Sequence, residues 1–253
     1  MNIDLHGKTA LVTGASGELG RAIVLALARC GADIAIHYYR SKEKAISLQE
    51  QVARIGSKNC IVQADVTKQE SVNNMKSIVE ADLQSPDIIV TSAVIQYTQT
   101  EILDQSTQDY ISQFESCILH NVLMAQAFVP SMISRGWGRV IGINTECSMQ
   151  CFPTQSAYVA GKRGMDGVLR VLAKEIGKHQ ITVNQVAPGW MISKNLPDDN
   201  EERHIVYKEK VPLGRRGNEQ DVANVVAFLS SDLANFITGA FIPVCGGNVM
   251  PTI

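Results

Sequence analysis

TALVTGASGELG, residues 9–20, is the stretch that predicts the fold: a short apolar run followed by a glycine-rich turn. An apolar helical pattern begins at Arg21 and stops near Gly31. Strand, glycine-rich turn and helix in this order are typical of a dinucleotide-binding unit. Gly14 would allow the tight turn, Gly20 would let the helix pack closely on the strand, and the amides at the helix start would face a pyrophosphate. A purely structural glycine turn is the alternative interpretation.

Outward from this unit, strand-like and helix-like patterns alternate to the end of the chain. Apolar runs predict strands at residues 9–13, 33–38, 60–63, 87–91, 139–143, 182–187 and 241–244. Amphipathic patterns predict helices at 42–55, 69–83, 107–134, 157–179 and 219–230, and Thr67-Lys68-Gln69-Glu70 has the form of a capping box. The alternation predicts an α/β fold: a single Rossmann-type, doubly wound parallel sheet of about seven strands with helices on both faces.

No linker, repeat or shift in composition divides the chain, so we expect one dinucleotide-binding and catalytic domain over residues 1–253. The polar stretch at about 190–213 follows a predicted strand at its carboxyl end, where ligands bind in such sheets. We therefore expect a substrate loop there that covers the ligand as a lid. The alternative is a surface connection without such a role.

Composition disfavours several classes of partner. The net charge of −2 gives no electrostatic footprint for nucleic acid or an anionic membrane. No apolar run reaches the roughly 18 residues of a membrane span, and the first residues lack the pattern of a secretory signal. Six scattered cysteines without a C-x-x-C pair, and five dispersed histidines, predict reduced thiols and no metal site. We expect a cytoplasmic protein.

A second informative stretch, TQSAYVAGK at residues 154–162, places Tyr158 and Lys162 four residues apart. On a helix both side chains would lie on one face. A tyrosine ordinarily titrates near ~10, and a nearby ammonium favours the phenolate and brings the pKa towards neutral pH. Proton exchange with a carbonyl or alcohol oxygen needs such a group. Taken alone, the pair could also be a chance feature of a helix surface.

With these motifs in order, residues 7–247 resemble the short-chain dehydrogenase/reductase family. The resemblance rests on the glycine turn, the Tyr/Lys pair and the spacing of the motifs between and after them. Those further motifs are Ala64-Asp65-Val66, the strand end at 87–93, Gly138-Arg139-Val140-Ile141, Pro188-Gly189 and Ile237-Thr238-Gly239-Ala240.

The resemblance implies specific roles. Tyr158 would be the general acid in reduction and the base in oxidation, and Lys162 would hold the nicotinamide ribose and lower the pKa of Tyr158. Thr145, thirteen residues before the tyrosine, would bond the substrate oxygen in place of the usual serine. No metal is implied. The implied cofactor contacts are Gly14, Ser16, Glu18, Leu19, Gly20, Tyr39, Arg40, Ser41, Asp65, Val66, Ala93, Tyr158, Lys162, Pro188, Gly189, Ile192 and Ser193.

The chain departs from the family pattern at several positions. Glu18 stands where the middle glycine of the turn is usual, and a carboxylate there is repulsive to a pyrophosphate unless it points outward. Cys117 stands at the asparagine of the catalytic tetrad, and a thiol is only a weak donor and acceptor. Asn121, one helical turn later, is a candidate substitute. Thr91, Ser92 and Val94 depart from the usual Asn-Asn-Ala-Gly, and we expect them to cap the central strand; the alternative is a role in substrate binding.

Cofactor preference can be predicted from the end of the second strand. NAD-dependent members usually carry an acid there, whereas this strand ends in His37-Tyr38-Tyr39-Arg40-Ser41. Arg40 can clamp a phosphate bidentately, and the segment is similar to that of NADPH-dependent pteridine reductases. NADP(H) is therefore favoured over NAD(H); the alternative is that Arg40 is only a solvated cap residue.

The favoured function is an NADP(H)-dependent oxidoreductase resembling 3-oxoacyl-ACP reductases, acting on a small-molecule or acyl-carrier-linked carbonyl. The alternative is a catalytically weak or inactive nucleotide-binding protein, because Glu18, Cys117 and Thr145 all depart from the pattern. The family resemblance and the apolar residues of the 157–179 helix imply a homo-oligomer, a tetramer or a dimer. Residues predicted by position to form a mainly apolar substrate pocket are Gln96, Tyr97, Met149, Cys151, Phe152 and Trp190, and plain core packing is the alternative for each.

Overall fold

The computed structural model describes residues 2–193 and 201–251. Within these residues seven strands form one sheet in the order β3-β2-β1-β4-β5-β6-β7, and every neighbouring pair is parallel. The predicted α/β fold is therefore confirmed. The strands are β1 (Thr9–Thr13), β2 (Asp33–Tyr38), β3 (Asn59–Gln63), β4 (Ile88–Thr91), β5 (Gly138–Ile143), β6 (Ile181–Pro188) and β7 (Phe241–Val244).

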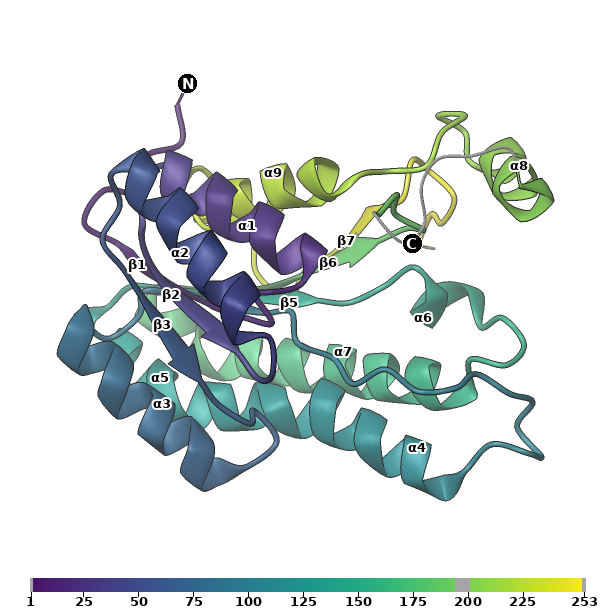
Figure 1. The fold of residues 1–253 in the computed structure, drawn as a ribbon, viewed down its shortest axis with the longest axis horizontal. Helices are drawn as coiled ribbons and strands as arrows, with labels where there is room; N and C mark the ends of the chain where they lie inside the picture. The colour runs from purple at the N-terminus through teal and green to yellow at the C-terminus, as the bar shows by residue number, and fades with distance from the viewer. Residues whose placement is uncertain (1, 194–200, 252–253) are drawn as a thin grey trace.

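Helices cover both faces of the sheet (Figure 1). One face carries α1 (Glu18–Arg29), α2 (Lys42–Ile55) and α9 (Glu219–Leu229). The other carries α3 (Gln69–Asp82), α4 (Thr107–Gln113), α5 (His120–Arg135) and α7 (Ser156–Ile176). Two short helices, α6 (Cys147–Gln150) and α8 (Glu202–Lys210), lie beyond the carboxyl ends of β5 and β6. That edge of the sheet is where ligands bind in open α/β folds.

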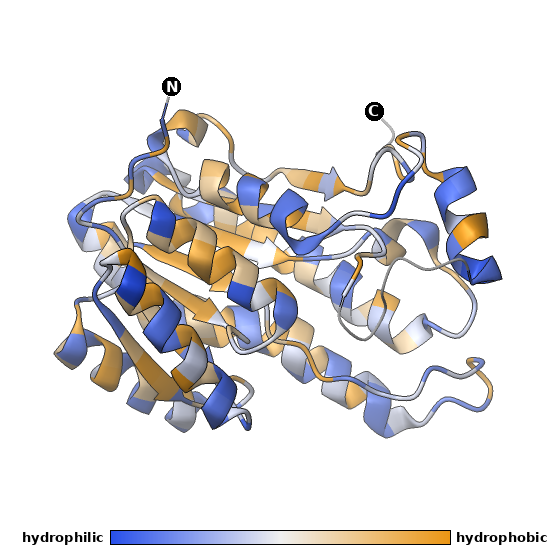
Figure 2. Cartoon of the chain, turned by 45° about the horizontal axis from the view of Figure 1, so that its top comes forward, coloured by the Kyte–Doolittle hydropathy of each residue, from blue (hydrophilic) through white to orange (hydrophobic). Residues whose placement is uncertain are grey.

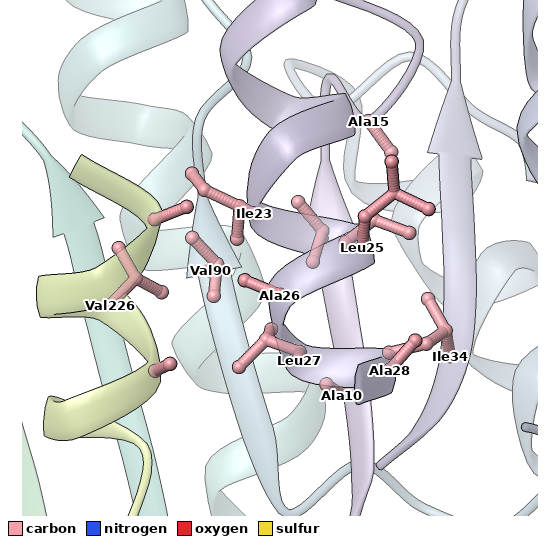
Figure 3. Close-up of a cluster of buried hydrophobic side chains, with 14 of the residues drawn as sticks. Ala10, Ala15, Ile23, Leu25, Ala26, Leu27, Ala28, Ile34, Val90 and Val226 are labelled. Carbon is pink, nitrogen blue, oxygen red and sulfur yellow. The ribbon is translucent and has the colours of Figure 1, made fainter. Parts of the chain in front are cut away.

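Apolar strands are sandwiched between the inward faces of these helices, whereas the outer faces of the helices are largely hydrophilic (Figure 2). Figure 3 shows Ile23 and Leu27 of α1 among side chains from the sheet and from α9. Both are fully buried, as are Val90 and Val226. Burying each such side chain contributes about 1.5–3 kcal/mol, so the core holds α1, and with it the glycine turn, rigidly against the sheet.

The helix predicted at 107–134 is continuous, but it changes type in the middle. A π-helical segment, η1 (Phe114–Leu119), separates α4 from α5. By length and mean composition the helical run Thr107–Arg135 is apolar enough to cross a membrane, although polar residues interrupt it throughout. Of its most apolar window 56% is buried inside the protein, against the sheet and neighbouring helices. Core packing accounts for this apolar surface.

The predicted capping box at residues 67–70 is wrong. Helix α3 begins at Gln69, and Lys68 is its N-cap without a side-chain bond. Thr67 is engaged elsewhere, because its N–H and its hydroxyl both donate to Asp65 Oδ1, at 3.0 and 2.7 Å. The Thr67 hydroxyl, which a capping box would place on a backbone N–H of the helix, is therefore bonded within the preceding turn. A complete box caps α9 instead, built from Asn218 and Asp221.

The predicted loop at 190–213 contains a helix. Helix α8 occupies much of its second half, and residues 194–200 lie outside the described residues. His204 is fully buried in α8 and meets the edge of Trp190 with ring centroids 4.9 Å apart. Aromatic packing of this kind orders a segment whose polar composition suggested a loop.

Candidate active site

The glycine turn brings α1 close to β1. A Cβ on Gly20 would lie 2.3 Å from the carbonyl oxygen of Gly14, which is too close for any other residue. Glu18, Leu19 and Gly20 form the first turn of α1, where backbone N–H groups lack intrahelical partners. These amides face a hollow of about 340 Å³, named here the inner hollow. Its lining also includes Gly14, Gly17, Ser92, Val94, Gln96, Ile143, Asn144, Thr145, Tyr158, Lys162, Pro188 and Gly189.

An outer hollow of about 560 Å³ continues from it along the carboxyl ends of β2 and β3. The two hollows share Val94 and Gln96 in their walls. The outer hollow contains the sequence-predicted residues Ser16, Tyr39, Arg40, Ser41, Asp65, Val66 and Ala93. Of the predicted cofactor contacts, only Ile192 and Ser193 are missing from the described linings of both hollows. The N–H of Ile192 instead donates to the carbonyl of Gly217 at 2.8 Å.

Thr145, Tyr158 and Lys162 come together at the inner hollow. Thr145 follows β5, whereas Tyr158 and Lys162 lie one turn apart at the start of α7. The Thr145 side chain lies close enough to the Tyr158 hydroxyl to lower the pKa of the phenol. Lys162 Nζ lies 5.7 Å from the centroid of the Tyr158 ring and donates a 2.6 Å bond to the carbonyl of Ile143. The backbone N–H of Tyr158 is bound by the hydroxyl oxygen of Tyr97 at 2.9 Å.

Burial controls the protonation of this group. It raises the pKa of Tyr158, and the nearby Cys147 and Cys117 thiols act in the same direction, while the Thr145 side chain partly offsets them. Burial also lowers the pKa of the Lys162 ammonium. Burial therefore raises the pKa of Tyr158 by more than the lowering expected from the Lys162 ammonium. The phenol is protonated at neutral pH and can donate its proton.

Asn144 was missed by sequence reasoning, although it fixes the geometry of the site. Its Nδ2 donates to the Lys162 carbonyl at 3.1 Å and to Gln185 Oε1 at 2.7 Å, and its Oδ1 accepts from the N–H of Thr145 at 2.8 Å. One buried amide thus ties β5 to α7 and β6. Its place directly before Thr145 was the only available signal.

A separate pocket of about 660 Å³, named here the substrate pocket, opens beside the inner hollow. The two share Gln96, Thr145, Tyr158 and Gly189. Four of the predicted pocket residues line it (Gln96, Tyr97, Phe152 and Trp190), whereas Met149 and Cys151 do not. Several charged or polar lining residues carry no signal in the sequence, namely Glu146, Arg203, Tyr207, Lys210 and Asn248. They are far apart in sequence and follow no motif.

Comparisons with known proteins show the family to which the chain belongs. The sequence profile of the family described as Enoyl-(Acyl carrier protein) reductase matches residues 14–248. A 3-oxoacyl-[acyl-carrier-protein] reductase of Staphylococcus epidermidis is 36% identical over 250 residues, which cover 96% of this chain and 99% of the relative. This chain is a short-chain dehydrogenase/reductase.

Solved structures of similar proteins include cofactor complexes. A blue fluorescent protein from a metagenomic library, solved with NADPH, is 30% identical with a TM-score of 0.90, covering 98% of this chain and 100% of the other. A gluconate 5-dehydrogenase from Burkholderia cenocepacia, solved with NADP and tartrate, is 27% identical with a TM-score of 0.90, covering 98% and 97%. As a short-chain dehydrogenase/reductase, the chain is an oxidoreductase.

The two hollows of this short-chain dehydrogenase/reductase fit a dinucleotide. The close approach of Gly20 to Gly14 leaves a cradle lined by backbone, and the exposed Arg40 lies at the outer end. Glu18 is exposed at the first position of α1, where an acid suits the helix dipole, and it interacts with another residue. Among the described residues, no group of three His, Cys, Asp or Glu side chains is placed to hold a metal ion.

Cys117 and Thr91, two positions that depart from the family pattern, are both hydrogen-bonded to Asn121. Asn121 Nδ2 donates to the Cys117 carbonyl at 2.7 Å, and Thr91 donates to Asn121 Oδ1 at 2.7 Å. The Cys117 thiol itself points to Gln113 Oε1 at 3.7 Å. Asn121 therefore spans β4 and the π-helical segment of this short-chain dehydrogenase/reductase, and both ends of its amide are engaged. We predicted that Thr91 caps the central strand; its hydroxyl bonds Asn121 instead.

Proposed function

We propose that this oxidoreductase uses NADPH to reduce a carbonyl group, with Tyr158 as the proton donor. The observation that carries the proposal is the placement of Tyr158 and Thr145 together in the wall shared by the inner hollow and the substrate pocket. Bound NADPH would supply a hydride to the carbonyl carbon. The protein must then supply a proton to the carbonyl oxygen, and a protonated phenol in that wall is the group to do so.

Each of the other residues has a defined part in the proposal. The Thr145 hydroxyl donates a hydrogen bond to the carbonyl oxygen as negative charge develops on it. The Lys162 ammonium stabilises the phenolate that remains after proton transfer, because an opposite charge nearby favours the ionised form. Asn144 holds Thr145 and the backbone of Lys162 in register.

NADPH is proposed over NADH because the outer hollow contains Arg40 and Ser41. A guanidinium binds phosphate oxygens bidentately, whereas no acid follows β2 to bind a ribose hydroxyl. The two solved relatives with bound NADPH or NADP support this preference.

The proposed substrate is a 3-oxoacyl thioester on an acyl carrier, as the name of the Staphylococcus relative suggests. The substrate pocket supports it with the amide side chains of Gln96, Gln99 and Gln155. These groups can pair with the amides of a pantetheine arm. In this proposal residues 1–253 act as one domain, and Trp190 together with α8 forms a wall of the substrate pocket.

We further propose a cytoplasmic homo-oligomer, with a tetramer favoured. Exposed apolar side chains lie on the helical layer that contains the tyrosine. They include Ile111, Phe114 and Val171, which are 50%, 53% and 55% exposed. Burial of these side chains between subunits would remove them from water.

The test measures NADPH oxidation with acetoacetyl-coenzyme A as a soluble 3-oxoacyl thioester. Tyr158→Phe should lower kcat by about 10²-fold or more, the usual contribution of a positioned general acid. Tyr38→Phe, a change in the buried core of β2, serves as the matched control. NADPH titration should give similar affinities for both variants. Turnover by Tyr158→Phe close to that of the parent would contradict the proposal.

A second candidate function is a nucleotide-binding protein with little or no turnover. The thiol of Cys117 favours it, because this residue occupies the place of a polar relay residue and bonds only weakly to Gln113. Tight NADPH binding together with no oxidation across a panel of carbonyl compounds would support this second function.

A further inference from the structure

Glu146 is a buried acid directly after Thr145, and nothing in the proposed reaction uses it. Its side chain lies in the wall of the substrate pocket, yet the residue is only 3% exposed. A buried carboxylate is costly unless its oxygens accept hydrogen bonds. The contacts of Glu146 therefore indicate what the acid is for.

The directions of three hydrogen bonds follow from the donors involved. The backbone N–H of Trp190 donates to the Tyr207 hydroxyl at 2.8 Å. The Tyr207 hydroxyl donates its own proton to Glu146 Oε1 at 2.7 Å. Asn248 Nδ2 donates to Glu146 Oε2 at 3.1 Å. An ionised carboxylate satisfies both of its donors, because each oxygen accepts one bond.

These bonds join segments that are distant in the chain. Glu146 follows β5, Tyr207 is 61 residues away in α8, and Asn248 is 102 residues away near the C-terminus. The hydroxyl of Tyr207 also requires Gly189, because a Cβ there would lie 2.6 Å from it. Trp190 packs edge-on against Tyr207, with centroids 5.4 Å apart. The wall that α8 contributes to the pocket is thus held at Glu146.

We propose that Glu146 is a positioning residue of the substrate pocket, whose carboxylate holds α8 and the segment at Asn248 beside Thr145. Glu146 with its hydrogen bonds to Tyr207 and Asn248 is named here the latch. The inference rests on the proposed function for the identity of the pocket, but the latch itself can form in a protein without turnover. Loss of the carboxylate leaves the Tyr207 and Asn248 donors competing for one acceptor or none. Helix α8 then loses its fixed distance from Thr145, and the carbonyl substrate loses a wall.

The chain offers a direct reporter for this contact. It has two tryptophans, Trp137 and Trp190, so Trp137→Phe leaves only the tryptophan whose backbone N–H donates to Tyr207. In this background Glu146→Gln keeps the size of the side chain but provides a single acceptor oxygen. Tyr207→Phe removes the hydroxyl from the other side. Glu209→Gln, an exposed acid of the same helix, is the matched control.

We expect each single variant to raise the acrylamide quenching constant of Trp190 about twofold, because breaking a charge-assisted hydrogen bond frees the segment. The double variant should exceed neither single variant, since both remove one interaction. Glu209→Gln should match the parent. Unchanged quenching in both single variants, or additive effects in the double variant, would overturn the proposal. If Glu146→Gln does not fold, the result for Tyr207→Phe decides.

Kinetics with acetoacetyl-coenzyme A provide the second readout. Glu146→Gln and Tyr207→Phe should each raise KM about tenfold, as expected for loss of a hydrogen bond to a charged group, with a smaller effect on kcat. The affinity for NADPH should stay at the parent value. A protein without turnover can still show the quenching result, so failure of the proposed function and failure of the latch are distinguishable. An active protein with unchanged KM and quenching in these variants would reject the latch alone.

Discussion

The backbone N–H of Gly14 donates a 3.0 Å hydrogen bond to Nδ1 of His37, 23 residues away. Nδ1 is then the acceptor, so Nε2 carries the proton and donates to the Ala64 carbonyl at 3.0 Å. One imidazole therefore joins the glycine turn, β2 and the end of β3. Burial keeps it neutral by lowering the pKa of His37 to about 4.

His37→Leu should destabilise the protein and weaken NADPH binding. The change leaves the N–H of Gly14 and the carbonyl of Ala64 without their buried partner, and each unsatisfied group costs about 1–3 kcal/mol. Urea denaturation and NADPH titration measure the two effects. The exposed His6→Gln serves as the control. Parent-like stability of His37→Leu would show that the bridge is unimportant.

Stability should fall as the pH decreases from about 7 to 5. Burial lowers the pKa of His37 to about 4 and that of His120 to about 3, below the ordinary 6.5. The unfolded chain therefore binds protons in this range that the folded chain does not, and each histidine costs up to about 1.4 kcal/mol per pH unit. Urea denaturation at several pH values measures the slope.

His120 supplies the control for that slope. Its Nε2 is buried and has no hydrogen-bond partner among the described residues. His120→Leu should therefore reduce the pH dependence between 7 and 5 by about half, because one of two titrating groups is removed. A slope unchanged by this variant would assign the pH dependence to other groups.

Arg40→Ala should raise the Kd for NADPH about tenfold and leave the Kd for NADH nearly unchanged, as expected for loss of a bidentate phosphate contact. The control is Lys42→Ala, which removes an exposed cation at the start of α2. Isothermal titration with each cofactor measures both constants. Equal weakening of NADPH and NADH binding would contradict a role in phosphate recognition.

Thr145→Val should lower kcat about 10²-fold, whereas Thr145→Ser should keep most of the activity. Valine has nearly the shape of threonine but no hydroxyl, and loss of one donor to a developing oxyanion typically costs about 10²–10³ in rate. Steady-state kinetics with acetoacetyl-coenzyme A distinguish the two variants. Similar rates for both would exclude the hydroxyl as a substrate contact.

Two glycine variants should act in opposite directions. Gly20→Ala places a methyl group 2.3 Å from the Gly14 carbonyl oxygen, so α1 must move and NADPH binding should weaken. Gly167→Ala adds a methyl group in open space within α7 and should stabilise the protein by about 0.5–1 kcal/mol. Thermal unfolding and NADPH titration compare them. Parent-like values for Gly20→Ala would contradict the close packing.

The sequence determined the order and type of most elements, because apolar periodicity and turn residues act locally. The predicted bounds of β1, α2 and β7 are those of the structure. The Tyr158/Lys162 pair and the glycine turn could be recognised for the same reason, since each motif lies within one element and its flanking turn.

Only the tertiary structure decided which side chains meet across the sheet edge. Glu146, Tyr207 and Asn248 follow no shared period, and their contact depends on how α8 packs on Trp190. The same holds for His37 and Gly14, and for Thr67, whose hydroxyl bonds Asp65 rather than capping a helix. Hydrogen bonds between distant segments depend on the packed positions of both partners, and no local pattern in the chain encodes those positions.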